Sequence, residues 1–154
     1  MDLVRNLTAD NKKRLEGDVF FPLFNAYIRM RAEAAAPLDY IHRCAEYLNS
    51  LNPTLIEELC RSSIRYCHTF RNAVGEPKWA FQQPREVLKL ITPRRLLVPL
   101  PMNGPQPVLH MELDCAWEEE HGLEWIVRDD RVIYTGGFGS HNPWRDHKES
   151  WNYA

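Results

Sequence analysis

The residues whose types could do chemistry gather in one short stretch of the chain. His110, Glu112 and Asp114 alternate with apolar residues, so a strand here would place their side chains on one face. One imidazole and two carboxylates on one face could bind a metal ion or transfer protons. The same pattern is typical of the exposed face of a half-buried antiparallel sheet, which needs no chemical role. We favour the exposed face and expect no metal site.

A second ionisable group follows in a stretch that is typical of a turn, Glu118-Glu119-Glu120-His121-Gly122. A carboxylate beside a histidine suits acid–base catalysis, because it can bring the imidazole pKa near neutrality. No nucleophile motif such as G-x-S-x-G accompanies this group. We therefore predict a protein that is not an enzyme and holds no cofactor. The alternative is a small metal- or acid–base-dependent enzyme built on His110, Glu112, Asp114, Glu120 and His121.

The cysteines have the spacing of ordinary buried thiols rather than of a metal site. No two of them form a C-x-x-C pair, which zinc sites usually show. The first residues of the chain lack the apolar core and the small-residue cleavage site of a secretory signal. We expect reduced thiols and a cytoplasmic protein. The cysteines are Cys44, Cys60, Cys67 and Cys115.

The net charge of −2 conceals an asymmetry along the chain. Residues 106–137 contain two basic and eight acidic side chains, which gives this segment a charge of −6. The charge could simply improve solubility, or it could steer a basic partner towards the protein. It would repel phosphates, and the chain has no run of about 18 apolar residues that could span a membrane. We expect neither a nucleic-acid partner nor a membrane partner.

The elements that must position these residues are predicted to be helices in the first part of the chain. Apolar residues recur there at helical spacing, and Asn52-Pro53 combines a capping residue with a proline suited to the first turn. Gly75 is a suitable stop for that helix. The expected helices cover 10–16, 20–28, 37–48, 53–75 and 84–91.

The second part of the chain is predicted to be a sheet. Its clearest signal is strict alternation of apolar and polar residues, and Asp129-Asp130 is typical of a two-residue hairpin loop. Pro99 cannot donate to a strand ladder, which favours an edge strand where it occurs. The expected strands cover 96–100, 109–117, 123–128 and 132–134.

Helices first and antiparallel strands afterwards indicate an α+β fold. We predict N-terminal helices packed on a C-terminal antiparallel sheet of about three to four strands. We expect a single domain over 1–154. Its parts are a helical half over about 1–92, a β half over about 95–137 and an aromatic tail over about 138–154.

The predicted tail carries aromatic residues in a polar segment. Trp144 and Trp151 either dock back onto the domain or serve as anchors for a partner. The glycine-rich residues before them do not form a phosphate loop, because no Lys-Ser or Lys-Thr follows.

One stretch resembles the hallmark of a bacterial domain family of unknown biochemical function. The hallmark is C-E-W-(D/E)-x-E-H-G-L, and the chain reads CAWEEEHGL over 115–123, followed by Trp125, Gly136 and NPW at 142–144. Members of this family are often encoded beside toxin genes of polymorphic and contact-dependent secretion systems, so the resemblance implies an immunity protein. The chain departs from the hallmark at Ala116 and Glu118, which speaks against a catalytic role for the motif.

The motif also has a structural interpretation. Trp117 falls on the apolar face of its strand, and Glu120 and His121 lie where the chain is expected to reverse. Gly122 permits backbone angles that a turn requires. A direct binding or catalytic role is the alternative. The expected structural device that fixes the hairpin consists of Cys115, Trp117, Glu120, His121 and Gly122.

We predict a cytoplasmic immunity protein that neutralises a cognate secreted toxin by stoichiometric occlusion. Toxins that act on nucleic acids or nucleotides tend to be basic, and acidic inhibitors associate quickly with basic partners. A structural interaction module is a further alternative, and the oligomeric state stays open. The expected partner-binding residues are Glu112, Asp114, Glu118, Glu119, Asp129 and Asp130, with Trp144 and Trp151 as anchors.

Overall fold

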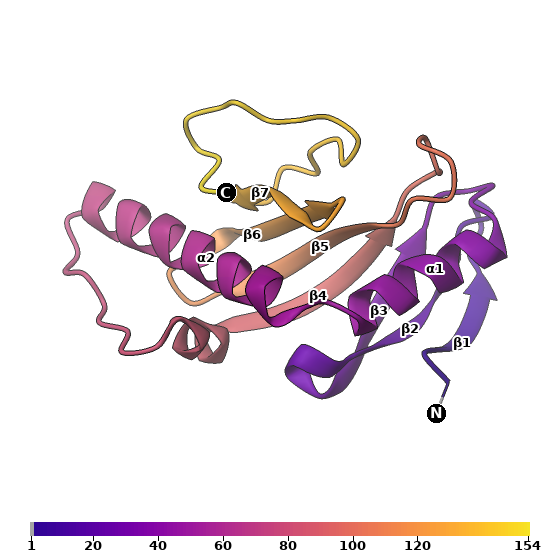
Figure 1. The fold of residues 1–154 in the computed structure, drawn as a ribbon, viewed down its shortest axis with the longest axis horizontal. Helices are drawn as coiled ribbons and strands as arrows, with labels where there is room; N and C mark the ends of the chain where they lie inside the picture. The colour runs from indigo at the N-terminus through magenta and orange to yellow at the C-terminus, as the bar shows by residue number, and fades with distance from the viewer. Residues whose placement is uncertain (1) are drawn as a thin grey trace.

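Three antiparallel strands begin the chain (Figure 1), so the helices expected over 10–16 and 20–28 are wrong. In the second strand, Gly17, Val19 and Phe21 are buried and their neighbours are not, which is the period of a strand. The computed structural model describes residues 2–154, and the three strands are β1 (Val4–Ala9), β2 (Leu15–Phe21) and β3 (Ala26–Ala32).

The aromatic residues of this region fit a hairpin as well as a helix, which explains the wrong prediction. Phe20 and Tyr27 are register partners across β2 and β3, and their ring centroids lie 5.3 Å apart. Asn25 reverses the chain between the two strands with a φ of 49°. Asparagine tolerates this left-handed conformation better than most residues. A turn and a cross-strand pair therefore produce the same spacing as two helical turns.

All seven strands belong to one sheet, in which they lie in the order of the sequence. Neighbouring strands are antiparallel except β3 and β4, which are parallel. The fold is α+β, but the expected sheet of three to four antiparallel strands under N-terminal helices is wrong. The sheet is larger and mixed, and the helices over 38–90 come between its third and fourth strands in the sequence. The remaining strands are β4 (Ile91–Val98), β5 (Val108–Cys115), β6 (Glu118–Arg128) and β7 (Arg131–Gly136).

β4 lies inside the sheet, between β3 and β5, and is not the edge strand predicted from Pro99. Pro99 follows Val98, the last residue of the strand, so its missing N–H removes no ladder bond. Pro93 does lie within the strand, at a register shift between Pro93 and Arg95. A bulge of this kind tolerates a proline that a regular ladder would not.

The helices supply the crossover that two parallel neighbouring strands require. The predicted start of the longer helix is confirmed, because Asn52 Oδ1 accepts a hydrogen bond from the Leu55 N–H at 2.8 Å and Pro53 begins the helix. No helix among residues 2–154 is long and apolar enough to cross a membrane. The helical elements of the crossover are α1 (Leu38–Asn49), α2 (Pro53–Ala73) and the 3-10 helix η2 (Pro84–Leu90), and a further short 3-10 helix, η1 (Pro22–Phe24), lies between β2 and β3.

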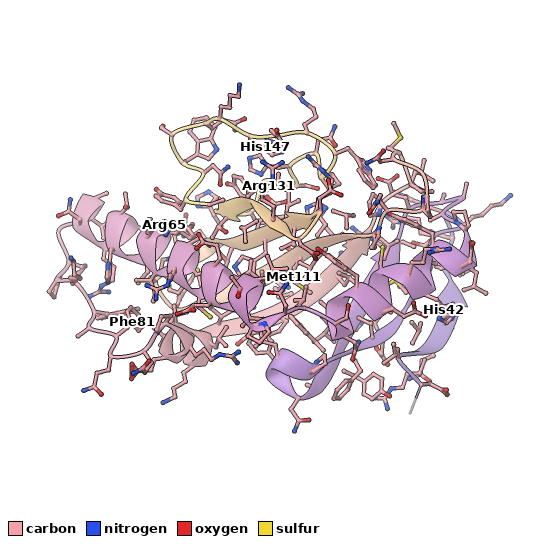
Figure 2. All side chains as sticks on the ribbon, in the orientation of Figure 1. His42, Arg65, Phe81, Met111, Arg131 and His147 are labelled. Carbon is pink, nitrogen blue, oxygen red and sulfur yellow. The ribbon has the colours of Figure 1, made fainter. Side chains whose placement is uncertain are left out.

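The main core fills the space between α1, α2 and one face of the sheet. Met111, Trp125 and Val127 are fully buried there, and Met111 lies near the centre of this layer in Figure 2. The Trp125 indole N–H donates to Ser63 Oγ on α2 at 2.9 Å. Because side chains alternate along a strand, the residues between these point to the opposite face of the sheet.

The opposite face is covered over β5–β7 by the chain's own C-terminal tail. Ile126 and Tyr134 pack there with Trp144 in a second, smaller core. The tail ends along β7 (Figure 1), where the Tyr153 N–H donates to the Thr135 carbonyl at 2.8 Å. This contact protects an edge strand from pairing with another chain.

On β2–β4, and at Glu112 of β5, the same face carries charged and aromatic side chains that are exposed or half-buried, and we call this area the open face. Asp18, Arg29, Arg95 and Glu112 are successive register partners, so they form one row across four strands. The open face consists of Glu16, Asp18, Phe20, Tyr27, Arg29, Arg31, Arg95, Leu97 and Glu112.

Candidate functional site

The centre of the candidate site is Glu124, whose side chain is fully buried between two histidines. Glu124 Oε2 lies 2.5 Å from His110 Nε2, and Glu124 Oε1 lies 2.6 Å from His141 Nδ1. The backbone N–H groups of Gly139 and His141 donate to the same carboxylate at 3.1 and 3.0 Å. Four donors thus satisfy a carboxylate that burial has removed from water.

Three elements bring this cluster together. His110 on β5 and Glu124 on β6 lie diagonally across neighbouring strands, within reach of long side chains. His141 comes from the tail, and its ring stacks on Tyr134 of β7 with centroids 4.0 Å apart. The His147 ring meets the His141 ring edge-on, with centroids 5.2 Å apart. The cluster therefore attaches the tail to the sheet.

The hydrogen bonds keep Glu124 ionised. Burial by itself raises the pKa of Glu124, but the hydrogen bonds from His110 and His141 outweigh burial and hold this pKa below its ordinary value. Since an ionised carboxylate has no proton to donate, each histidine must donate through the nitrogen that faces Glu124. The second ring nitrogen of His110, Nδ1, is then the atom left for other contacts.

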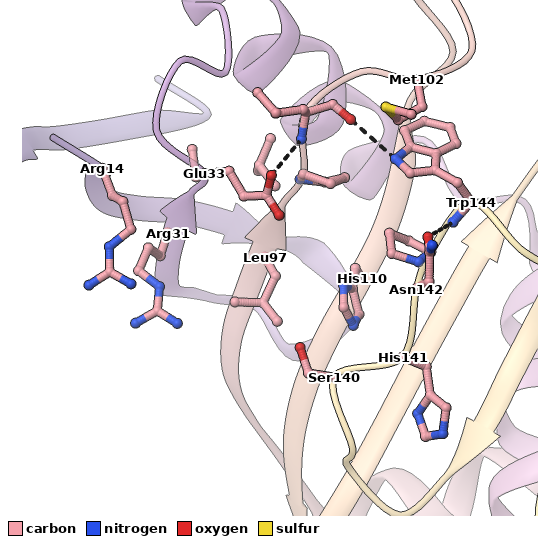
Figure 3. Close-up of a pocket in the computed structure, with 15 residues that line it drawn as sticks. Arg14, Arg31, Glu33, Leu97, Met102, His110, Ser140, His141, Asn142 and Trp144 are labelled. Atoms are coloured by element: carbon pink, nitrogen blue, oxygen red, sulfur yellow. Dashed lines mark hydrogen bonds between the residues drawn. The ribbon is translucent and has the colours of Figure 1, made fainter. Parts of the chain in front are cut away.

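A pocket of about 510 Å³ adjoins His110 (Figure 3). It lies between the ends of β3 and β4 and the first part of the tail. Arg14 and Arg31 line one end of the pocket, and Met102 and Trp144 line the other. Leu97 lies between Arg31 and His110, because the three are successive register partners across β3, β4 and β5.

The three residues predicted to share a strand face are not brought together around a ligand. Glu112 is the register partner of Arg95, and Asp114 forms an ion pair with Arg94 at 3.5 Å, whereas His110 turns to Glu124. Among residues 2–154, no group of three or more His, Cys, Asp or Glu side chains has an arrangement that could hold a metal ion.

The thiols are buried and free, and none has the environment of a nucleophile. Burial raises the pKa of Cys60 and of Cys67 to about 11, and the pKa of Cys115 to about 12. Burial also raises the pKa of Cys44.

The predicted acidic surface does not form one patch. Glu118 is buried, with only 7% of its surface exposed, and Asp129 and Asp130 lie at the opposite end of β6 from Glu119. Asp130 accepts a hydrogen bond from the Tyr47 hydroxyl at 3.0 Å. Of the two predicted anchors, Trp144 packs against the core, whereas Trp151 is 54% exposed.

The turn predicted over Glu118–Gly122 is wrong, because β6 already begins at Glu118. The chain reverses at Ala116-Trp117, directly before it, since Cys115 and Glu118 are register partners. Trp117 is buried, as expected. The strand pair is tight enough here that only two residues fit in the loop.

Glu118, and not Glu120, holds the motif together. Its carboxylate accepts hydrogen bonds from the backbone N–H groups of Glu120 and His121, each at 2.9 Å. The His121 ring nitrogen Nδ1 lies 2.7 Å from the same carboxylate. Gly122 has a φ of +67°, and a Cβ atom at this position would lie 2.6 Å from the Leu113 carbonyl oxygen. The motif acts as a structural brace of the β5–β6 hairpin.

Sequence reasoning found His110 but missed Glu124 and His141. Glu124 alternates with the core residues of β6, which is also the pattern of an exposed polar residue. His141 lies in a segment without periodicity, 17 residues from Glu124. No local spacing connects the two, so only the path of the tail reveals the contact.

A family described as a domain of unknown function (DUF6985) matches residues 3–142 of the chain. The match includes every residue of the buried cluster and ends inside the tail. No curated protein and no solved structure matches significantly.

Proposed function

This chain belongs to the DUF6985 family of domains of unknown function, and we propose that it is an immunity protein, which binds a secreted toxin stoichiometrically and neutralises it. The observation that carries the proposal is the open face, where charged and aromatic side chains stand ordered on a sheet that the tail leaves uncovered. The hallmark stretch over 115–123, which resembles that of proteins encoded beside toxin genes, supports the class of partner.

Ion pairs hold the charged side chains of the open face in place. Arg29 lies 3.6 Å from Asp18 and 3.8 Å from Glu16, and Arg5 lies 3.7 Å from Asp18. Exposed pairs of this kind contribute little to stability. They do restrict the side chains before a partner arrives, which lowers the entropy cost of binding.

The composition of the open face suits a protein partner. Tyr27 packs edge to face on Phe20, and the Arg5 guanidinium lies 3.5 Å from the centroid of the Tyr27 ring. Tyrosine and arginine are the residue types that dominate binding energy at protein interfaces. We therefore place the contact surface on the open face rather than on the dispersed acidic residues.

The exposed acids act at longer range. Asp114, Glu119 and Glu120 surround the tip of the β5–β6 hairpin, in the segment that carries a net charge of −6. A basic toxin would be drawn towards this end of the molecule, and the attraction would weaken as salt screens it.

The experiment is a rescue of growth by co-expression with the product of the neighbouring gene. We expect the wild-type chain to rescue growth, and the double variant Tyr27→Ala, Arg29→Ala to lose rescue. Arg61→Ala is the matched control, because Arg61 is also an exposed, ion-paired arginine but lies on α2. A neighbouring product that is not toxic, or equal rescue by all three proteins, would contradict the proposal.

Acid–base chemistry is a second candidate, favoured by the two histidines on Glu124 beside the pocket. The proposed residues differ from those expected from the sequence, since Glu112, Asp114 and Glu120 are not part of the cluster. Its metal-dependent form has no ligand group among residues 2–154, so we expect no bound metal in the purified chain and no shift of its melting temperature with divalent ions. Bound metal that His110→Asn removes would contradict this expectation.

A further inference from the structure

We propose that the pocket beside His110 binds a small organic oxyanion, namely a carboxylate or phosphate monoester attached to an apolar ring. The pocket volume of about 510 Å³ is in the range of small-molecule sites. Arginines line one end of the pocket and apolar side chains line the other, which indicates a ligand with one charged end and one apolar end (Figure 3).

Arg31 is the principal residue for the charged end. Among residues 2–154, no carboxylate lies within 4.0 Å of its guanidinium, whereas Arg14 beside it is tied to Asp10 at 2.8 Å. Burial lowers the pKa of Arg31, and repulsion from Arg95 and Arg14 lowers it further. An anion in the pocket would relieve this repulsion, and a guanidinium binds carboxylate or phosphate through two parallel hydrogen bonds.

The acidic groups near Arg31 leave room for an anion. Glu16 and Glu112 attract Arg31 from a distance without forming an ion pair. Glu33 lines the pocket and keeps its negative charge, but its Oε2 accepts a hydrogen bond from the Leu100 N–H at 3.4 Å rather than pairing with Arg31. Arg31 is therefore left to pair with an anion.

His110, which Leu97 separates from Arg31, is held in a fixed orientation. Its Nε2 is bound to Glu124, which sets the tautomer and the direction of the ring. No hydrogen bond to His110 Nδ1 is present in the part of the chain that the structure describes, and His110 lines the pocket. A hydroxyl or acidic proton of the ligand can donate to this nitrogen.

The other end of the pocket suits an apolar ring. The Trp144 indole N–H donates to the Leu100 carbonyl at 3.1 Å, which holds the Trp144 ring at that end (Figure 3). Met102 is 71% exposed at the rim and can fold onto a ligand, as flexible methionines do. Burying a ring against these side chains adds affinity that inorganic phosphate cannot gain.

The test is a titration of the full chain with phenyl phosphate, benzoate and inorganic phosphate. The NMR signal of the Trp144 indole N–H monitors binding. We expect saturable shifts with phenyl phosphate or benzoate, and at least about tenfold weaker binding of inorganic phosphate. Arg31→Gln should weaken binding by at least about tenfold.

Arg94→Gln is the matched control, because Arg94 lies on the neighbouring strand β4 but pairs with Asp114 outside the pocket. We expect it to keep wild-type affinity. No saturable binding up to about 10 mM, equal losses in the two arginine variants, or equal affinity for phosphate and phenyl phosphate would each overturn the proposal. Arg31 also belongs to the open face, but the titration contains no protein partner, so its outcome does not depend on the immunity function.

Discussion

At the scale of single residues, the buried Glu124 is the residue whose side chain joins the tail to the sheet. It accepts hydrogen bonds from β5 and from two positions of the tail, so one carboxylate links three segments. Removing one member of a buried charged cluster leaves the others without a partner, which costs more than the loss of an exposed pair.

We predict that Glu124→Gln lowers the free energy of unfolding by about 3 kcal/mol. Glutamine has nearly the same shape, but it carries no negative charge and its amide accepts fewer hydrogen bonds. Urea unfolding of both proteins at neutral pH measures the difference. Glu119→Gln on the same strand is the control, and we expect a change within about 0.5 kcal/mol because Glu119 is exposed. Equal effects of the two substitutions would contradict the role of Glu124.

The pH dependence of stability follows from the same carboxylate. The folded-state pKa of Glu124 lies below the ordinary value of 4.5, so its contribution to stability is fully present above that value. The contribution is lost as the pH falls through the lowered folded-state pKa. We predict that the stability difference between wild type and Glu124→Gln is largest near neutral pH and shrinks in acid. Urea unfolding at a series of pH values measures it, and a difference that grows in acid would show that the sign is wrong.

Individual residues could be predicted from the sequence only where a local pattern marks them. The alternation over β5 placed His110 and Glu112 on one face, and it identified Trp117 as a core residue. It could not show that Glu124 is buried, because the segment that covers it lies 15 to 17 residues further along the chain.

At the scale of elements, the β5–β6 hairpin depends on a brace made by the EEEHG segment. Glu118 accepts two backbone N–H groups, and Gly122 takes a backbone conformation that other residues adopt at a cost. Glu118, two residues before the expected Glu120, makes these contacts, and the structural role of the motif stays a prediction.

We predict that Gly122→Ala lowers the free energy of unfolding by about 2–4 kcal/mol. The new Cβ would meet the Leu113 carbonyl oxygen at 2.6 Å in addition to the strain of a positive φ. Gly75→Ala separates the two effects, because Gly75 has a φ of +77° with nothing within 4 Å of the new Cβ. We expect it to cost only about 1 kcal/mol. Thermal or urea unfolding of the two variants would contradict this account if their losses were equal.

The elements that could be predicted are those with chemical start and stop signals. Asn52-Pro53 marked α2, and Asp129-Asp130 marked the loop before β7, where both residues have positive φ. β2 and β3 were missed because the aromatic spacing over residues 20–27 fits a helix. The parallel pairing of β3 with β4 was missed because it joins residues more than 60 positions apart, with no local signal.

At the scale of the whole molecule, the tail completes the sheet. It covers one face of β5–β7, provides His141 for the buried cluster, and ends in a stack of Tyr153 on Tyr66 of α2. Covering both a face and an edge with one segment prevents exposed strands from pairing with other chains.

We predict that ending the chain after Gly137 strongly destabilises the protein and promotes aggregation. The truncation removes a partner of Glu124, uncovers the second core and exposes the edge of β7. Melting temperature and light scattering measure both effects. Trp151→Ala is the control, since its side chain is largely exposed, and we expect little change. A truncated chain that scatters light no more than the wild type and has the wild-type melting temperature would contradict the role of the tail.

The arrangement of charge also belongs to the whole molecule. The acidic residues around the hairpin tip lie apart from the open face. In this proposal the acidic residues attract the partner at long range, and the open face makes the direct contact. Salt should therefore slow association with a basic partner more than it speeds dissociation.

Direct binding to the product of the neighbouring gene tests the immunity proposal most sharply. Calorimetry of the two purified proteins should give one-to-one binding with a Kd below about 1 µM at low salt, weaker at high salt. The Tyr27→Ala, Arg29→Ala variant should bind at least about tenfold more weakly, and Arg61→Ala should bind like the wild type. No binding at any salt concentration, or equal binding by all three proteins, would contradict the account.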